Sequence, residues 1–303
     1  MSEATPAKKP PRPPITPGSL PATWAAAALV WLLSLIAPRT RAALARFVGR
    51  AGFALGIRRK VTLENLRHAF PDKSEDERRH IARGAYENMA ETAVDAVTAP
   101  LWSDEALRAH LDYSAMAKVA ERMKRREPTL LASAHLGSWE LFADAMVRLG
   151  HPLAAVVRPL EGAFNARVVE ARQKAGLQLI LQRGALRQML KTLKRGTTVV
   201  QLIDQVVPKD VGVFVPFFGR PASTAPSLAA VALKTGAPLF MLAALRRGDR
   251  LEVRCEEVPV APSGDFRRDV EVLTAQMTAR LEGWIRDTPE QWLWLHRRWK
   301  VQP

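Results

Sequence analysis

Residues 129–150, TLLASAHLGSWELFADAMVRLG, hold the pattern that decides the fold. The apolar run TLLASA is typical of a buried β-strand, and it ends directly at His135. Gly137 then permits a tight turn, and Ser138 is a favourable N-cap for an amphipathic helix from about Trp139 to Gly150. A corner of this kind, from strand to helix, exposes a side chain at the carboxyl edge of a sheet, where open α/β folds bind ligands.

His135 is a candidate general base, and Glu140 is a candidate for the acid that orients its imidazole. The alternative is that Glu140 only complements the dipole at the helix N-terminus. Position favours the catalytic interpretation. Of the six histidines in the chain, only His135 ends an apolar run and opens a glycine turn.

The same pattern, a strand followed by polar residues, recurs along the chain. LAAVV (153–157) leads to Arg158, TTVVQLI (197–203) leads to Asp204 and Gln205, and PLFMLAAL (238–245) leads to Arg246 and Arg247. Helical periodicity covers 139–149, about 163–175, 184–194 and 225–235. The alternation predicts a single α/β domain with a mostly parallel sheet flanked by helices, and LEVRCEEVPV (251–260) adds an antiparallel strand. The polar strand ends would then gather at one edge, as a site for an anionic substrate.

Composition narrows the functions that are possible. The 303 residues carry a formal net charge of +15, and residues 1–60 hold ten Lys or Arg against one acidic residue, Glu3. Such a segment favours anionic lipid, nucleic acid or an acidic protein. A single cysteine, Cys255, excludes an internal disulfide. Since no Cys/His cluster and no glycine-rich phosphate loop is present in the sequence, we expect neither a metal nor a cofactor.

The basic N-terminal part divides into a tail and an attachment segment. Residues 1–21 carry seven prolines and are expected to be disordered. Residues 22–60 are expected to associate with a membrane, which leaves 61–303 as the catalytic domain. The apolar run 22–37 is short for a spanning helix, which needs roughly 20 residues, so it could span the bilayer or lie on it. Its arginine-rich C-terminal flank would place the body of the protein in the cytoplasm.

Residues 39–57 predict an amphipathic helix. One face carries Leu44, Phe47, Val48, Ala51 and Leu55, and the opposite face carries Arg39, Arg46 and Arg50. The apolar face could pack against the core or lie in a membrane interface, and the neighbouring apolar run favours the membrane. Further along, Ser74 and Glu77 predict a capping box at the start of another helix.

Nucleic-acid binding is the alternative from another class of function. The charge fits, but the basic residues accompany an apolar segment, and no recognition motif appears. PEQWLWLHRRWK (289–300) has three tryptophans that could stack on bases, seat a helix at a membrane or pack in the core. Core packing is the commoner fate of tryptophan, and we expect no nucleic-acid partner.

Several blocks of the sequence together resemble the late acyltransferases of lipid A biosynthesis, the lauroyl/myristoyl transferase family. They are VTLENLRHAFPDKSEDERRHIAR (61–83), AHLGSWE (134–140), VVRPLEG (156–162), IDQVVPKDVGVFVPFFGRPAST (203–224) and PEQWLWLHRRWK (289–300). The resemblance covers nearly the whole chain from about Trp24. Ser138 is a small departure, since many members of the family have Asn there.

The resemblance implies transfer of a fatty acyl chain from acyl carrier protein to a hydroxyl of a phosphorylated, Kdo-bearing lipid A precursor. The enzyme would work at the cytoplasmic face of the cell inner membrane, and its partners would be the carrier protein, the glycolipid acceptor and the membrane surface. Another glycolipid acceptor would be compatible with the same chemistry.

The resemblance also implies roles for single residues. His135 would deprotonate the acceptor hydroxyl, and Glu140 would hold the imidazole. Arg172 is the first candidate for stabilising the oxyanion, and Arg158 is the second. Arg158 could instead form a structural salt bridge with Asp204. Asp204 and Gln205 complete the candidates for substrate binding.

Overall fold

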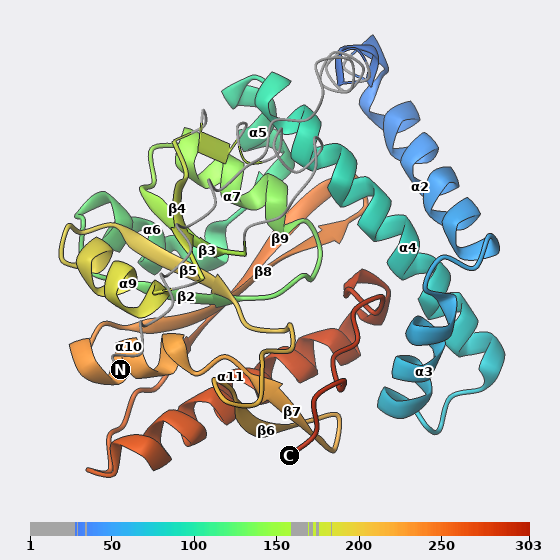
Figure 1. Ribbon diagram of the computed structural model, residues 1–303. Coiled ribbons are helices and arrows are strands. Elements are labelled where there is room, and N and C mark those ends of the chain that lie inside the picture. The colour runs from blue at the N-terminus through green and yellow to red at the C-terminus, as the bar shows by residue number, and fades with distance from the viewer. Residues whose placement is uncertain are drawn as a thin grey trace, which may run out of the picture.

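The computed structural model describes residues 28, 30–33, 35–158, 169, 172–173, 176–182 and 184–303. A sheet of seven strands in the order β1-β9-β8-β2-β5-β3-β4 forms the centre of the molecule (Figure 1). The strands are β1 (Leu111–Asp112), β2 (Leu130–Ser133), β3 (Leu153–Val157), β4 (Gln178–Leu181), β5 (Thr198–Leu202), β8 (Leu239–Arg247) and β9 (Arg250–Val258). β2, β3, β4, β5 and β8 run parallel, and β9 pairs antiparallel with β8. The predicted mixed and mostly parallel sheet is confirmed.

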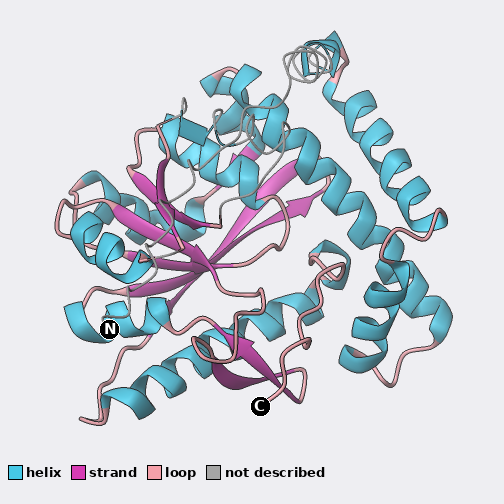
Figure 2. Ribbon diagram, in the orientation of Figure 1, coloured by secondary structure: helices cyan, strands magenta, loops and turns pink. Residues whose placement is uncertain are grey.

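Helices cover both faces of the sheet (Figure 2). α5 (Asp104–His110), α6 (Ala117–Lys124) and α7 (Trp139–Arg148) pack on one face, and α9 (Ala185–Leu193), α10 (Ser227–Thr235) and α11 (Phe266–Asp287) pack on the other. Successive strand residues alternate between two cores, so Leu130 belongs to the core beside α10 and α11 while Leu131 belongs to the core beside α7. Burial on both faces explains why these strands are continuous apolar runs in the sequence.

α2 packs along the outside of α4, away from the sheet (Figure 1). Helices α2 (Pro38–Ala54), α3 (Arg59–Ala69) and α4 (Glu75–Thr98) precede the sheet in the chain, and the predicted capping box of Ser74 and Glu77 begins α4. The contact of α2 with α4 is close because Gly49 has no side chain. A Cβ atom at Gly49 would lie 2.4 Å from the backbone oxygen of Tyr86.

The apolar face of α2 points away from the protein. Leu44, Phe47, Val48 and Leu55 are 44%, 67%, 57% and 79% exposed. Toward α4 the helix presents small residues and the buried Phe53, and Arg46 and Arg50 pair with Glu91 and Glu87. Packing of the apolar face against the core, the alternative considered above, is therefore wrong. Within the described part of the chain, no helix is both long and apolar enough to cross a membrane.

The C-terminal segment returns to the body of the protein and is largely buried. η3 (Pro289–Gln291) follows α11, and Trp292 and Trp294 are 1% and 0% exposed. They pack beside the hairpin of β6 (Val213–Phe217) and β7 (Arg220–Thr224), where Phe217 and Phe218 form further edge and tilted ring contacts. Core packing is thus the fate of these two tryptophans, and the side chains of Phe217 and Phe218 also lie in this core.

The secondary-structure predictions for 129–150, 153–157, 197–203, 225–235 and 238–260 match β2 with α7, β3, β5, α10 and β8 with β9. Elements that were not predicted include the strands β1, β4, β6 and β7, together with the short helices η1 (Ala99–Leu101) and η2 (Ser114–Met116). The helix expected at 163–175 and the tail 1–21 lie largely or wholly outside the described residues.

Candidate active site

The turn after β2 is held by backbone hydrogen bonds from two neighbouring segments. The Gly137 and Ser138 amides donate to Gln291 (3.0 Å) and Ala244 (2.8 Å), and the Leu293 amide donates to the carbonyl of His135 (3.1 Å). Gly137 has a φ of +67°, and a Cβ atom there would lie 1.9 Å from the Ala244 carbonyl oxygen, so only glycine fits. The predicted glycine corner therefore places the imidazole of His135 at the carboxyl edge of the sheet.

Asp204 at the end of β5 is the carboxylate that orients this imidazole. Its Oδ1 lies 2.8 Å from Nδ1 of His135, and its Oδ2 accepts the backbone amide of the same residue at 3.0 Å. The indole Nε1 of Trp292 donates to Oδ2 as well, at 2.9 Å. The pairing follows from the sheet order, since β2 and β5 are adjacent and parallel. With Nδ1–H donating to Asp204, Nε2 is left to accept a proton.

Asp204 is 2% exposed and still ionises readily. Burial alone would raise its pKa, but the charge of His135 and the hydrogen bonds from His135 and Trp292 lower the pKa to about 2. The carboxylate therefore stays negative at neutral pH, where it can stabilise a protonated imidazole. The sequence identified Asp204 as a substrate-binding candidate but gave no sign of this pairing.

Glu140 has a different partner from the one predicted. It forms an ion pair with Arg172, whose Nε lies 3.0 Å from Oε2, and it accepts the indole Nε1–H of Trp139 at 3.0 Å. The prediction that Glu140 holds the imidazole has to be corrected, because Nδ1 of His135 is bonded to Asp204. Glu140 instead fixes the guanidinium of Arg172 beside the same cavity.

The remaining candidates take up different places around His135. The side-chain amide of Gln205 lies 3.2 Å from Nε2 of His135. Arg158 is exposed at the end of β3, and its Nε donates to Gln182 at 3.3 Å instead of pairing with Asp204. Arg246 turns away toward α4, where it pairs with acidic residues.

A cavity of about 510 Å³ opens beside the imidazole. Its polar end carries His135, Glu140, Arg158 and Arg172, and the rest of its lining is mostly apolar, including Phe142, Leu153, Leu177, Val200, Leu202 and Leu242. An apolar pocket with a few converging polar groups suits a ligand with a hydrocarbon chain and a reactive polar end.

The structure also describes the groups on which a cysteine nucleophile or a bound metal ion would depend. The thiol of Cys255 lies within β9, where burial and the neighbouring Glu256 and Glu257 raise its pKa to about 11, so it is a poor nucleophile. Among the described residues, no three or more His, Cys, Asp or Glu side chains gather in a way that could hold a metal ion.

Comparisons with known proteins identify the family of this chain. Residues 18–301 match the family model described as bacterial lipid A biosynthesis acyltransferase. A lipid A biosynthesis lauroyltransferase of Escherichia coli (strain K12) is 26% identical over 283 residues, which are 93% of this chain and 92% of that protein. A lipid A biosynthesis palmitoleoyltransferase of the same organism is 24% identical over 247 residues, covering 81% and 80%. A phosphatidylinositol mannoside acyltransferase of Mycolicibacterium smegmatis is 27% identical over 174 residues, 56% of each chain. Because the family model spans nearly the whole sequence, the chain belongs to the bacterial lipid A biosynthesis acyltransferases.

Proposed function

We propose that the protein transfers a fatty acyl chain from acyl carrier protein to a hydroxyl of a Kdo-containing lipid A precursor. The observation that carries this proposal is the His135–Asp204 pair at the polar end of an apolar cavity, in a chain of this family. The pair supplies a general base, and the cavity supplies room for a hydrocarbon chain.

In the proposed reaction, Nε2 of His135 takes the proton of the acceptor hydroxyl as its oxygen attacks the carbonyl carbon of the thioester. Asp204 stabilises the resulting imidazolium through Nδ1–H. Negative charge develops on the former carbonyl oxygen, and the guanidinium of Arg172, fixed by Glu140, stabilises it. The carbon–sulfur bond then breaks, and the thiolate receives the proton from Nε2, which gives the ester and a free thiol.

The donor and the acceptor both suit a basic protein. Acyl carrier protein has an acidic surface, and the precursor carries phosphates and carboxylates, whereas this chain has a formal net charge of +15. Arg158 is an exposed cation at the mouth of the cavity and is available to an anionic substrate.

Membrane association at the cytoplasmic face of the inner membrane is part of the proposal. Its support is the outward apolar face of α2, which together with the exposed Trp31, Leu32, Leu35 and Ile57 forms an extended apolar surface. We assign attachment to residues 22–60 and catalysis to residues 61–303, as the sequence predicts.

The test is a transfer assay with purified protein, a tetra-acylated Kdo-containing precursor and one acyl chain carried either by acyl carrier protein or by coenzyme A. We expect the carrier protein to be the better donor, and its kcat/KM to fall as salt rises, because salt screens the association of oppositely charged surfaces. Chemistry at His135 is the same for both thioesters, so any difference reflects docking. An equal or higher kcat/KM with coenzyme A would exclude the carrier protein as the preferred donor.

A different glycolipid acceptor is the second candidate, and the similarity to a phosphatidylinositol mannoside acyltransferase supports it. The catalytic groups would act in the same way. Transfer to a phosphatidylinositol mannoside but not to the lipid A precursor in the same assay would favour this candidate.

A further inference from the structure

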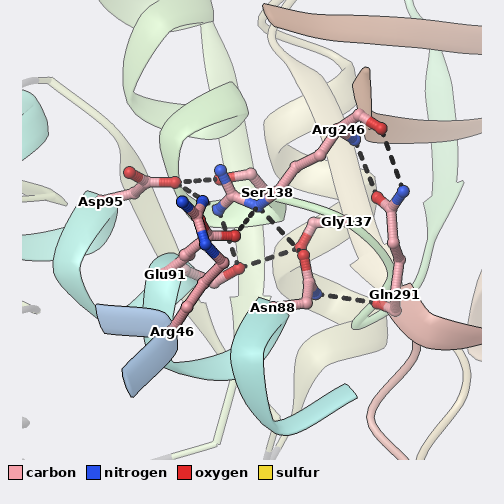
Figure 3. Close-up of polar contacts among 9 residues, drawn as sticks. Arg46, Asn88, Glu91, Asp95, Gly137, Ser138, Arg246 and Gln291 are labelled. Carbon is pink, nitrogen blue, oxygen red and sulfur yellow. Dashed lines mark hydrogen bonds and ion pairs between the residues drawn. The ribbon is translucent and has the colours of Figure 1, made fainter. Parts of the chain in front are cut away.

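A polar network runs from α2 to the turn that carries His135, through the interior between α4 and β8 (Figure 3). The side chain of Arg246, at the end of β8, lies at its centre and is 17% exposed. The carboxylates around it are also largely buried, since Glu91 and Asp95 are 12% and 14% exposed. Largely buried polar groups fix the positions of the residues around them when every donor and acceptor has a partner.

On one side, the network holds the turn. Asp95 forms an ion pair with Arg246 and accepts the hydroxyl hydrogen of Ser138 at 2.8 Å. This hydrogen bond draws the hydroxyl of Ser138 away from the helix, so α7 has no side-chain cap at Ser138, contrary to the sequence prediction.

The same side also fixes the Gly137 carbonyl. Asn88 and Thr92 donate to it at 3.2 Å and 3.0 Å, and both side chains in turn bond to Arg246. Arg246 further exchanges two hydrogen bonds with Gln291, whose backbone carbonyl accepts the Gly137 amide.

On the other side, the network reaches the outermost helix. Glu91 lies 3.6 Å from Nε of Arg246 and forms an ion pair with Arg46 of α2 at 2.7 Å. Arg46 is therefore connected to the turn by a chain of contacts that passes first through Glu91, then Arg246, then Asp95, as Figure 3 shows.

We propose that Arg246 is a positioning residue that couples the seating of α2 on α4 to the placement of the His135 turn. The inference rests on the proposed function, in which His135 acts as the general base. Arg246 faces away from the substrate cavity and acts on catalysis only through the turn. Since an error of about 1 Å in the placement of a catalytic group can reduce the rate about 100-fold, loss of this support should lower kcat.

The chain contains a matched control for the α2 arm. Arg50 lies one helical turn after Arg46 and pairs with Glu87 of α4 at 2.6 Å. Its side chain is 63% exposed, compared with 42% for Arg46, and no described contact joins the Arg50–Glu87 pair to Arg246. Each arginine joins α2 to α4 through one ion pair, but of the two only Arg46 has a described link to the turn.

The experiment compares Arg46→Met, Arg50→Met, Arg246→Met and Arg246→Lys for kcat, KM and melting temperature. We expect kcat to fall about 100-fold in Arg246→Met and about 10-fold in Arg46→Met, with KM changed less than about twofold. Arg50→Met should keep the wild-type kcat. Arg246→Lys should recover only part of the loss, because one ammonium cannot serve both carboxylates and Asn88 at once.

A readout that needs no activity separates this inference from the proposed function. The ¹⁵N resonances of the His135 imidazole, assigned with His135→Gln, should shift in Arg46→Met and stay in place in Arg50→Met. If the wild type transfers no acyl chain, the proposed function fails while these resonances still test the coupling. The coupling is overturned if Arg46→Met and Arg50→Met give the same kcat and the same resonances, or if Arg246→Met changes only the melting temperature.

Discussion

In the proposed mechanism the chemistry of His135 depends on Asp204, because Asp204 bonds both the imidazole and the backbone amide of that histidine. In Asp204→Asn, the amide oxygen can still accept Nδ1–H, but the side chain no longer carries the negative charge that would stabilise the imidazolium. We expect kcat to fall roughly 100- to 10,000-fold. The melting temperature should also fall, because the amide NH2 of Asn cannot accept the two N–H groups that now donate to Oδ2, while circular dichroism should still show the folded protein. A kcat near the wild-type value in the folded variant would contradict the role of Asp204.

Glu140 is the second acid near His135, but its side chain bonds to Arg172 and Trp139. Glu140→Gln should also slow transfer, but through the loss of a fixed guanidinium. Its effect should therefore disappear in an Arg172→Met background, whereas the effect of Asp204→Asn should persist there. Equal persistence of both effects would show that Glu140 acts directly on His135.

His296 predicts how stability responds to acid. Its Nε2 accepts the Val206 amide at 3.2 Å, and burial lowers its pKa to about 4, although Asp204 raises it in part. Between about pH 6.5, the usual histidine value, and pH 4, the unfolded chain therefore binds more protons than the folded chain. The folded state, in which His296 is neutral, is therefore destabilised relative to the unfolded chain as the pH falls from about 6.5 to 4, and it carries no such penalty above about pH 6.5.

The measurement is melting temperature against pH for the wild type and His296→Gln. Glutamine can still accept a hydrogen bond but does not titrate. Between pH 7 and pH 4.5 the melting temperature of the variant should therefore fall less than that of the wild type, by on the order of a few degrees. Identical slopes for the two proteins would show that His296 does not contribute. His68, His110 and His151, whose pKa values burial also lowers, should leave a remaining slope in the variant.

Residues that act alone were easier to predict than residues that act in pairs. His135 was recognisable because an apolar run, the histidine and a glycine follow one another along the chain. The bond from His135 to Asp204 joins residues 69 positions apart, and it exists because β5 lies next to β2. The order of strands in a sheet is not contained in local periodicity, so Glu140 was the nearest acid in the sequence without being the nearest acid in space.

At the scale of elements, the close contact of α2 with α4 depends on Gly49, whereas Gly52 of the same helix has room. A Cβ atom at Gly49 would meet the Tyr86 backbone at 2.4 Å, and one at Gly52 would meet only side-chain atoms, at 3.7 Å and 3.9 Å. Gly49→Ala should therefore destabilise the protein by about 1–3 kcal/mol. Gly52→Ala should be neutral or stabilising by up to about 1 kcal/mol, because alanine favours a helix.

Chemical denaturation of the two variants measures these effects with a common wild-type reference. Equal free energies of unfolding for Gly49→Ala and Gly52→Ala would contradict the close packing of α2 on α4.

The central strands were predicted well, and α2 shows where prediction from such patterns stops. The strands were recognisable because both of their faces are buried, which makes their apolar runs continuous. The amphipathic pattern of α2 was also recognisable, but the pattern alone does not say which face packs on the protein. The structure packs small residues and Phe53 inward and leaves Phe47 and Val48 outside.

For the whole molecule, the outward face of α2 predicts how the protein partitions to membranes. The triple substitution Leu44→Ser, Phe47→Ser and Val48→Ser removes apolar area without touching the core. Since full burial of one such side chain contributes about 1.5–3 kcal/mol, binding to vesicles that contain anionic lipid should weaken at least roughly tenfold. Sedimentation with vesicles measures the change.

The control is Phe266→Ser with Val272→Ser, two exposed apolar residues of α11. This variant should bind vesicles like the wild type. If both variants bind equally well, attachment does not depend on α2. Salt should weaken the wild-type binding only in part, because apolar insertion is not screened.

The turn and the cavity meet at His135 and share part of their structure, since Thr92, Ala244 and Leu293 bond to the turn and also line the cavity. The hydrogen bonds of the turn come from α4, β8 and the segment after α11, whereas Leu153, Leu177 and Val200 line the cavity from elsewhere. Substitutions at Leu153, Leu177 or Val200 should therefore change the depth of the cavity and leave the hydrogen bonds of the turn in place. Over generations, selection can thus alter the length of the accepted chain in small steps without interrupting turnover, and directed evolution of chain length should start from these wall positions.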